Sequence, residues 1–283
     1  IDKLTYYFLW ELSWIVGHIP RKINLRLGAF LGTVLYMFFS YRKEVVKRNL
    51  RIAYPSISDQ KLIEILKSLY KHFCMVIFDF LRFPFLNLRK LNKILSFSDQ
   101  ANDILANNSS GILLSAHLGN WEIIPHALGK YGHTVSAIAR KQKNIGVNRY
   151  LMWGRKLSGC KIIYKKGSTR QMMSSLKHGF LLMASDQYSS RNGIPISFFG
   201  KETRSPRGAS IFHLKTRAPI FFCIVYLNPD FSYTLHLEEL KLELDENLTN
   251  DEKIQKLNQQ YHHKLEEWII KYPQQYLWFH RKW

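Results

Sequence analysis

Residues 111–122 read Gly111-Ile112-Leu113-Leu114-Ser115-Ala116-His117-Leu118-Gly119-Asn120-Trp121-Glu122. The apolar first half has the length and composition of a buried strand, and a polar turn with a glycine follows it directly. Open α/β sheets usually bind and transform their ligands at such strand ends. The segment therefore predicts an α/β domain whose chemistry lies around His117.

His117 and Glu122 are the candidate catalytic pair. Five residues advance about 140° around an ideal helix, so the two side chains would not share one helical face. They meet if His117 ends the strand and Glu122 stands near the first turn of the next helix. The carboxylate would then hold one imidazole nitrogen and leave the other free as a general base. A histidine at a strand end is more often structural, but the nearby carboxylate and the basic segment that follows favour catalysis.

The segments around this strand alternate between the periodicities of strands and helices. We expect strands at residues 111–116, 134–139, 161–164, 180–185, 219–227 and 232–239, and helices near 122–130, 145–158, 168–178 and 206–216. Strands separated by helices of this length imply βαβ units. The predicted fold class is therefore α/β, with a mixed, mainly parallel central sheet flanked by helices. The last two strands, joined at Asn228-Pro229-Asp230, should form an antiparallel hairpin at the sheet edge.

Further helices are expected towards both ends of the chain. Residues 44–54 show an amphipathic pattern that Pro55 stops, and a second helix begins at Ser58. Thr249-Asn250-Asp251-Glu252 is a capping box and opens a long C-terminal helix. Residues 276–283 are too aromatic and basic for a frayed terminus, so we expect them to dock against the domain.

Two aromatic and apolar runs, residues 4–16 and 27–39, precede the domain. Neither reaches the roughly 20 apolar residues that a transmembrane helix needs. Basic residues flank the runs, namely Arg21, Lys22, Arg42 and Lys43. This composition suits helices at the membrane interface, with two ordinary core helices as the alternative. We therefore expect residues 1–42 to be a helical membrane-associating segment and residues 43–283 to be the catalytic domain.

Positive charge is the strongest compositional signal. The formal net charge is +20, from 41 Lys and Arg against 21 Asp and Glu. Residues 123–185 contain no acidic residue, and their basic residues are Lys130, Arg140, Lys141, Lys143, Arg149, Arg155, Lys156, Lys161, Lys165, Lys166, Arg170 and Lys177. Such a field attracts a phosphate-bearing lipid, a nucleic acid or an acidic protein. A solvated basic face is the alternative interpretation.

Several other chemistries lack their motifs. The sequence has no Gly-x-Ser-x-Gly nucleophile elbow, no P-loop and no dinucleotide fingerprint. Cys74, Cys160 and Cys223 have neither metal nor disulfide spacing, which indicates buried thiols in a reducing compartment. His262 and His263 lie on adjacent faces of one helix, so they cannot converge on a metal and are expected at the surface. No nucleic-acid-binding motif accompanies the basic residues.

Several blocks of the sequence resemble a known protein family. His117-Leu118-Gly119-Asn120-Trp121-Glu122 is similar to the His-x4-Asp/Glu block of the lysophospholipid and glycerolipid acyltransferase superfamily, in the form found in bacterial lipid A biosynthesis (late) acyltransferases. Further similar blocks follow the family's order: Arg42 to Pro55, Arg140-Lys141-Gln142-Lys143-Asn144, Arg155 with Gly159, Asp186-Gln187, Phe198-Phe199-Gly200, Thr203, Gly208-Ala209 and Pro273 to Trp283. One block alone is weak, but several in order over most of the chain are specific.

Two departures from the family pattern bear on acceptor specificity rather than on the chemistry. The helix before the core, at Met75-Val76-Ile77-Phe78-Asp79-Phe80, lacks the glutamate that the resemblance leads us to expect, with Asp79 as a possible substitute. Lys141 stands where other members often carry a small residue or proline.

The resemblance implies transfer of a fatty acyl chain from an acyl carrier protein or coenzyme A thioester to a hydroxyl of a lipid A precursor such as Kdo-lipid A. His117 and Glu122 would form the general-base pair, and backbone N–H groups near Gly119 would face the oxyanion. No cofactor or metal is expected. The anionic glycolipid acceptor would be bound by Arg140, Asn144, Arg155, Asp186, Gln187, Arg204 and Arg207, although the last two arginines also suit plain surface charge. The expected location is the bacterial inner membrane, with the catalytic domain on its cytoplasmic face.

Two other functions stay open. An acyltransferase for a different anionic acceptor, such as a lysophospholipid or a phosphatidylinositol mannoside, would use the same residues. A non-enzymatic basic protein that binds membranes or nucleic acid would bind in a salt-dependent way without using His117; because it has charge but no motif, we expect no nucleic-acid partner. Acyl-chain length and oligomeric state are not indicated by the sequence.

Overall fold

The computed structural model describes residues 2–39, 41–165, 167–190, 192–241 and 247–283. The helices are α1 (Asp2–His18), α2 (Arg21–Phe38), α3 (Lys43–Ala53), α4 (Asp59–Arg82), η1 (Phe83–Phe85), α5 (Leu88–Leu91), α6 (Asp99–Asn107), α7 (Ile123–Lys130), α8 (Ile145–Lys156), α9 (Thr169–Ser175), α10 (Gly208–Thr216), α11 (Asn250–Lys271) and η2 (Pro273–Gln275). The strands are β1 (Leu95–Phe97), β2 (Gly111–Gly119), β3 (Val135–Ala139), β4 (Lys161–Tyr164), β5 (Phe180–Ala184), β6 (Gly193–Phe198), β7 (Lys201–Pro206), β8 (Ile220–Leu227) and β9 (Tyr233–Glu239).

A seven-stranded sheet with the order β1-β9-β8-β2-β5-β3-β4 forms the centre of the molecule. Strands β8, β2, β5, β3 and β4 are parallel neighbours, because helical crossovers connect them. Within this sheet, β8 and β9 pair antiparallel, and β1 runs parallel to β9. The predicted mixed, mainly parallel α/β sheet is confirmed.

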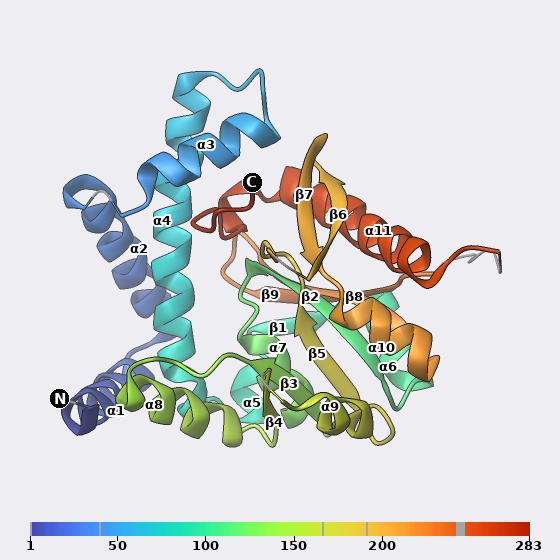
Figure 1. Ribbon diagram of the computed structural model, residues 1–283. Helices are drawn as coiled ribbons and strands as arrows, with labels where there is room; N and C mark the ends of the chain where they lie inside the picture. Colours follow the sequence, from blue (N-terminus) through green and yellow to red (C-terminus); the bar gives the residue numbers. More distant parts are fainter. Residues whose placement is uncertain (1, 40, 166, 191, 242–246) are drawn as a thin grey trace.

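Helices cover both faces of this sheet (Figure 1). Along β2, Ile112, Leu114 and Ala116 join the core that contains α9, α10 and α11, whereas Leu113 joins the core that contains α7. Strand β2 is thus buried on both sides, which explains why its sequence is an almost continuous apolar run rather than an alternating one.

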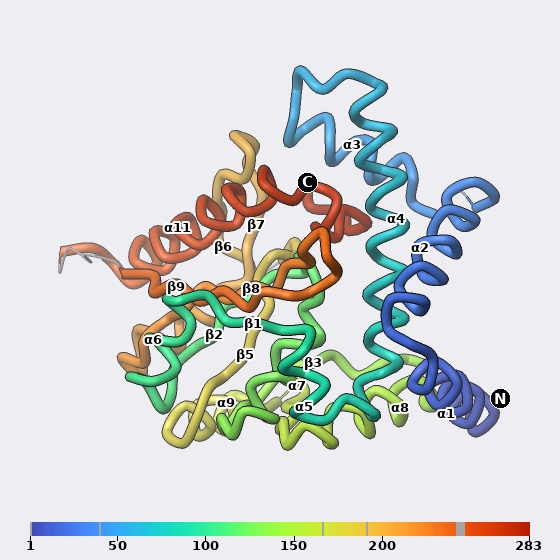
Figure 2. Tube along the Cα trace, turned by 180° about the vertical axis from the view of Figure 1, so that it is seen from behind, coloured from blue at the N-terminus to red at the C-terminus, as the bar shows by residue number. Residues whose placement is uncertain are grey.

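The N-terminal helices lie on the side of α4 that faces away from the sheet (Figures 1 and 2). Helix α2 packs along α4 so closely that a Cβ at Gly32 would come within 2.4 Å of the Tyr70 carbonyl oxygen. Helix α4 begins at its predicted N-cap, Ser58, whose hydroxyl accepts from the Lys61 amide. No single described helix is long and apolar enough to cross a bilayer; α2 and α3 together, bent by 99°, reach that length and composition.

Several elements differ from the sequence prediction. The hairpin of β8 and β9 is antiparallel as expected, but it is not the edge of the sheet, because the short strand β1 pairs with β9 on the outer side. The β6–β7 hairpin and helix α6 were not predicted, although Ser98 caps α6 and its apolar residues Ala101, Ile104 and Leu105 pack on the core at helical spacing. His262 is completely buried, so its expected surface position was wrong, whereas His263 is exposed.

Candidate active site

The carboxyl ends of the parallel strands bring together the residues that surround His117. Strand β2 carries His117 near its end, and the neighbouring strand β5 leads to Asp186 and Gln187 two and three residues beyond its last residue. Because parallel strands end at one edge of a sheet, side chains from segments almost 70 residues apart meet there. The C-terminal tail closes the same edge, since the Leu277 amide donates to the His117 carbonyl oxygen at 2.9 Å.

Asp186 is the carboxylate that holds His117. Its Oδ1 lies 2.8 Å from Nδ1 of the imidazole, and its Oδ2 accepts from the His117 backbone N–H at 3.1 Å. Burial lowers the pKa of His117, but the adjacent Asp186 charge and hydrogen bond outweigh it, and the pKa is raised above the usual 6.5. Burial likewise opposes ionisation of Asp186, yet His117 and then Lys282 hold its pKa well below the usual range. Nδ1–H therefore donates to Asp186, and Nε2 carries the lone pair.

The expected contact between Glu122 and the imidazole is not what the structure shows. Glu122 directly precedes α7, and both of its carboxylate oxygens accept from Arg155 on α8, at 2.7 to 3.2 Å. Its charge still contributes to the raised pKa of His117, after the larger effect of Asp186. Glu122 is thus a charged neighbour of the histidine and the partner of a bidentate arginine.

Gln187 and His280 lie on the open side of the imidazole. The Gln187 amide nitrogen is 3.4 Å from Nε2 of His117 and 3.0 Å from Nε2 of His280, so one NH2 group donates to both rings. Burial, followed by the charge of His117, lowers the pKa of His280 and keeps this second ring neutral. His280 was predicted only as part of a docked tail, because nothing in the local sequence of residues 276–283 indicates a neighbour 163 positions earlier.

A buried amine lies behind Asp186. The Lys282 ammonium donates to the Asp186 carbonyl oxygen and lies 3.2 Å from Nε2 of His262. Burial lowers the pKa of Lys282 to about 8 despite the attraction of Asp186, and burial with the Lys282 charge lowers the pKa of His262 to about 3. His262 is therefore neutral and can accept from the lysine.

The turn after β2 requires its glycine. Gly119 has φ +62°, and a Cβ there would come within 1.7 Å of the Val225 carbonyl oxygen, so no other residue fits. Two nearby backbone N–H groups are already used: that of His117 by Asp186 and that of Asn120 by Val225 at 3.1 Å. These two amides are therefore not available for the oxyanion role predicted around Gly119, and that role stays a prediction.

The remaining predicted binding residues have separate surroundings. Arg140 is exposed directly after β3, whereas the Asn144 side chain caps α8 by accepting from the Val147 amide at 2.9 Å. Arg204 donates to the Gly193 carbonyl oxygen at 2.6 Å, and Arg207 forms an ion pair with Asp251. Arg155 is thus connected to the surroundings of His117 through Glu122. Arg204 and Arg207 instead bond to residues away from His117.

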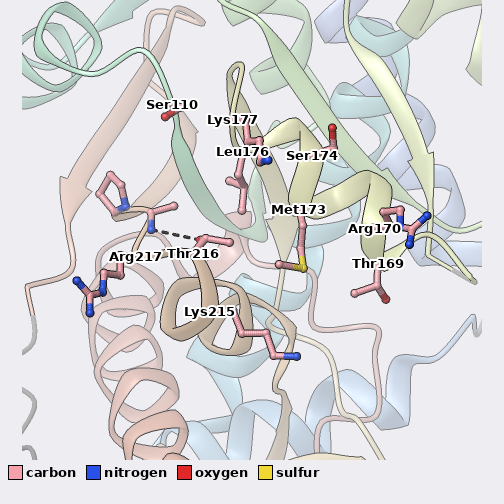
Figure 3. A pocket seen from close by; sticks show the side chains of 12 residues that line it. Ser110, Thr169, Arg170, Met173, Ser174, Leu176, Lys177, Lys215, Thr216 and Arg217 are labelled. Carbon is pink, nitrogen blue, oxygen red and sulfur yellow. Dashed lines mark hydrogen bonds between the residues drawn. The ribbon is translucent and has the colours of Figure 1, made fainter.

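A sizeable hollow lies away from this site. It has a volume of about 1170 Å³ and lies at the opposite edge of the sheet, where Ser110 and Pro219 precede β2 and β8. Figure 3 shows that Arg170, Lys215 and Arg217 around it point in different directions and not towards one centre. It lacks the converging polar groups of a reaction centre.

The chain is similar to known proteins. A model of the family "Bacterial lipid A biosynthesis acyltransferase" matches residues 1–283. The lipid A biosynthesis lauroyltransferase of Escherichia coli is 22% identical over 292 residues, covering 98% of this chain and 91% of that protein. Among solved structures, the 1-acyl-sn-glycerophosphate acyltransferase PlsC of Thermotoga maritima aligns with a TM-score of 0.38 and 14% identity, over 88% of this chain and 98% of that one. Because the family model matches the whole chain, the protein belongs to the bacterial lipid A biosynthesis acyltransferases and is an acyltransferase.

Proposed function

We propose that this acyltransferase moves a fatty acyl chain from an acyl carrier protein or coenzyme A thioester to a hydroxyl of a lipid A precursor, with His117 as the general base. The observation that carries the proposal is the 2.8 Å contact between His117 Nδ1 and Asp186 at the carboxyl edge of the parallel strands. It leaves Nε2 as the free basic atom, facing the Gln187 amide.

The proposed reaction needs only these groups. His117 Nε2 takes the proton of the acceptor hydroxyl as that oxygen attacks the thioester carbonyl carbon. The tetrahedral intermediate then expels the thiolate, the carbon–sulfur bond breaks, and the imidazolium returns its proton to sulfur. The products are an ester and a free thiol. Asp186 stabilises the imidazolium electrostatically and keeps its own charge.

Positive side chains support an anionic acceptor. Arg140 is exposed at the carboxyl end of β3, beside the exposed Lys141 and Lys143. A phosphate bound there would lie at the same sheet edge as His117, because β3 is the next strand beyond β5. In this proposal Arg155 acts through Glu122, Asn144 shapes the start of α8, and Gln187 is displaced from Nε2 when the hydroxyl arrives.

The N-terminal helices support attachment to a membrane surface, which we propose to be the cytoplasmic face of the bacterial inner membrane. Both helices carry large apolar side chains that are exposed. They are Leu4, Tyr7, Phe8, Trp10, Trp14 and Ile15 on α1 and Ile23, Leu27, Phe30, Leu31, Met37 and Phe38 on α2. Exposed apolar surface of this extent is rare unless something covers it. The charge of +20 suits anionic lipids and an acidic carrier protein.

His117→Ala tests the proposal most directly. Purified variant and wild-type protein are incubated with a carrier-bound acyl chain and a lipid A precursor, and the product is measured by mass spectrometry. We expect a loss of at least ~10³-fold in kcat with unchanged binding to vesicles, since the base is lost and the N-terminal face is not touched. His178→Ala, which removes an exposed histidine before β5, is the matched control and should keep full activity.

The same assay separates the alternatives. Full activity of His117→Ala would remove the general-base proposal. Acylation of a lysophospholipid or a phosphatidylinositol mannoside in preference to the lipid A precursor would replace the acceptor while keeping the chemistry.

A further inference from the structure

A buried chain of hydrogen bonds connects the turn after His117 with helix α2. The Asn120 side-chain amide donates to the Tyr233 hydroxyl at 3.1 Å, and that hydroxyl donates to Asp79 Oδ2 at 2.8 Å. Arg21, the first residue of α2, donates to both Asp79 oxygens at 2.7 to 3.1 Å. The four residues come from the β2–α7 turn, β9, α4 and α2.

The four hydrogen-bonded residues are buried or nearly so, and the position of the Tyr233 hydroxyl proton follows from the raised pKa of that group. Asn120 and Tyr233 are 0% exposed, Asp79 is 3% exposed and the Arg21 side chain is 12% exposed. Burial and the Asp79 charge raise the pKa of Tyr233 well above 10, so its hydroxyl keeps the proton that it donates to Asp79. A hydrogen-bonded network of this kind holds its members in one arrangement, because leaving any partner unpaired is costly.

Other contacts place the chain where it can affect the site. Asn120 also donates its backbone N–H to Val225, and the Gly119 carbonyl oxygen accepts from His72 of α4 at 3.3 Å. Burial lowers the pKa of His72 to about 4, so a neutral ring makes this bond. The turn between His117 and Glu122 is therefore held by β8, β9 and α4 together.

We propose that Asp79 and Tyr233 are positioning residues for catalysis, which link the catalytic turn to the lipid-facing helix α2 through Asn120 and Arg21. The proposal rests on the proposed function, in which His117 is the base. The hydrogen bonds keep Trp121 and Glu122, which follow Asn120, at fixed distances from the imidazole. Trp121 stacks edge-on against His117 with ring centroids 5.0 Å apart, so a shifted turn moves a wall of the reaction site.

Tyr233→Phe removes the central hydroxyl while keeping the ring that packs under the Arg21 guanidinium at 4.9 Å. The full chain is assayed in vesicles with a carrier-bound acyl chain and a lipid A precursor, well below the unfolding temperature. We expect kcat to fall about 10-fold, because displacements of ~1 Å can cost up to ~100-fold. The KM for the thioester and the acidic limb of the pH profile should not change, because His117 and Asp186 are untouched.

The control for a lost tyrosine hydroxyl is Tyr54→Phe. The Tyr54 hydroxyl donates to the Ile269 carbonyl oxygen and does not belong to the hydrogen-bonded network of Asn120, Tyr233, Asp79 and Arg21. It should keep wild-type kcat. If Tyr233→Phe lowers the unfolding temperature but keeps wild-type kcat, these hydrogen bonds only stabilise the fold and the inference is wrong. If His117→Ala is fully active, the proposed function fails instead, so the two failures are distinguishable.

Arg21→Lys tests the network at its α2 end, where the side chain is partly exposed, so the test does not depend on the folding of a core variant. Lysine keeps the charge but cannot hold Asp79 through two nitrogens. We expect a fall in kcat, again with an unchanged acidic limb. If the residues act as one unit, the double variant Arg21→Lys/Tyr233→Phe should lose no more kcat than Tyr233→Phe alone. A loss in kcat equal to the product of the two single losses would show that the two sites act independently, and it would overturn the proposal.

Discussion

Single residues at this site have roles that follow from their partners more than from their type. Asp186 and Glu122 are both carboxylates near His117, but Asp186 bonds Nδ1 whereas Glu122 bonds Arg155. The buried Asp186 interacts with the ring at short range, and the Glu122 charge is largely balanced by its arginine. We therefore expect Asp186 to control the protonation of the base and Glu122 to shape the anion-binding side of the site.

Asp186→Asn should change the pH dependence of the reaction. In the wild type the raised pKa of His117 places the acidic limb of kcat/KM above pH 6.5, because the base works only when neutral. Without the Asp186 charge, burial lowers the pKa of His117 by more than the smaller effect of the Glu122 charge raises it, so the limb should move to lower pH. The plateau should fall roughly 10²- to 10⁴-fold, because asparagine does not stabilise the imidazolium.

The measurement is a pH–rate profile of variant and wild type between pH 5 and 9. Glu122→Gln is the comparison: it should shift the limb in the same direction but by less, since the Glu122 charge contributes less to the pKa of His117. An acidic limb that stays in place in Asp186→Asn would exclude Asp186 as the partner of the base.

Elements on the two sides of α4 serve different purposes. The sheet and its helices bury their apolar residues, whereas α1 and α2 leave a row of large apolar side chains exposed. Helix α2 nevertheless packs tightly on α4, as the glycines Gly28 and Gly32 allow. The two N-terminal helices are thus part of the folded body on one face and exposed on the other, a pattern expected of helices that lie on a membrane.

Replacing Trp14 and Phe30 by serine should weaken binding to lipid vesicles. These side chains are 50% and 69% exposed, so their loss does not open the core. Each contributes roughly 1–2 kcal/mol if lipid covers it. The double variant should therefore partition at least ~10-fold less into anionic vesicles in a sedimentation assay.

Ile270→Ser is the control for this prediction, because Ile270 is 58% exposed but lies on α11. It should bind vesicles like the wild type. Equal losses for both variants would mean that vesicle binding is not specific to the N-terminal face.

The whole molecule is held together at its C-terminus. The tail bonds α3, because Asn49 donates to the carbonyl oxygens of Trp278 and His280 at 2.8 and 2.7 Å. It also bonds β2 through Leu277, and it bonds Asp186, two residues beyond β5, through Lys282. Trp278 is almost fully buried, so the tail is part of the core and one wall of the active site.

Asn49→Ala should destabilise the entire domain. It removes one buried and one partly buried hydrogen bond and leaves two carbonyl groups without this donor, which costs about 2–4 kcal/mol. Urea unfolding should show a lower midpoint with an unchanged m-value. Activity below the transition should also fall, because His280 loses its backbone anchor.

Asn107→Ala provides the matched control for this stability measurement. Asn107 is exposed on α6, and its side chain bonds the Asp103 carbonyl oxygen one turn away, so the change should stay within ~0.5 kcal/mol. A stability of Asn49→Ala equal to that of the control would contradict the role of the tail.

Local patterns in the sequence were enough to predict the features that depend on neighbours along the chain. The periodicities predicted the strands of the sheet except β1, the helices between them, the caps at Ser58 and Thr249, and the position of His117 at a strand end. These features follow from local hydrogen bonding and from the burial of one face, so a short window of residues contains the signal.

The partners of the site residues, in contrast, depend on how the whole domain folds. Glu122 is five residues from His117 and was expected to hold it, but Asp186, 69 residues away, does so because β5 pairs with β2. The same holds for His280 beside Gln187, for Lys282 behind Asp186 and for Tyr233 between Asn120 and Asp79. Which side chains meet depends on strand order and on the docking of the tail, and these are set by packing over the whole domain rather than by any local pattern.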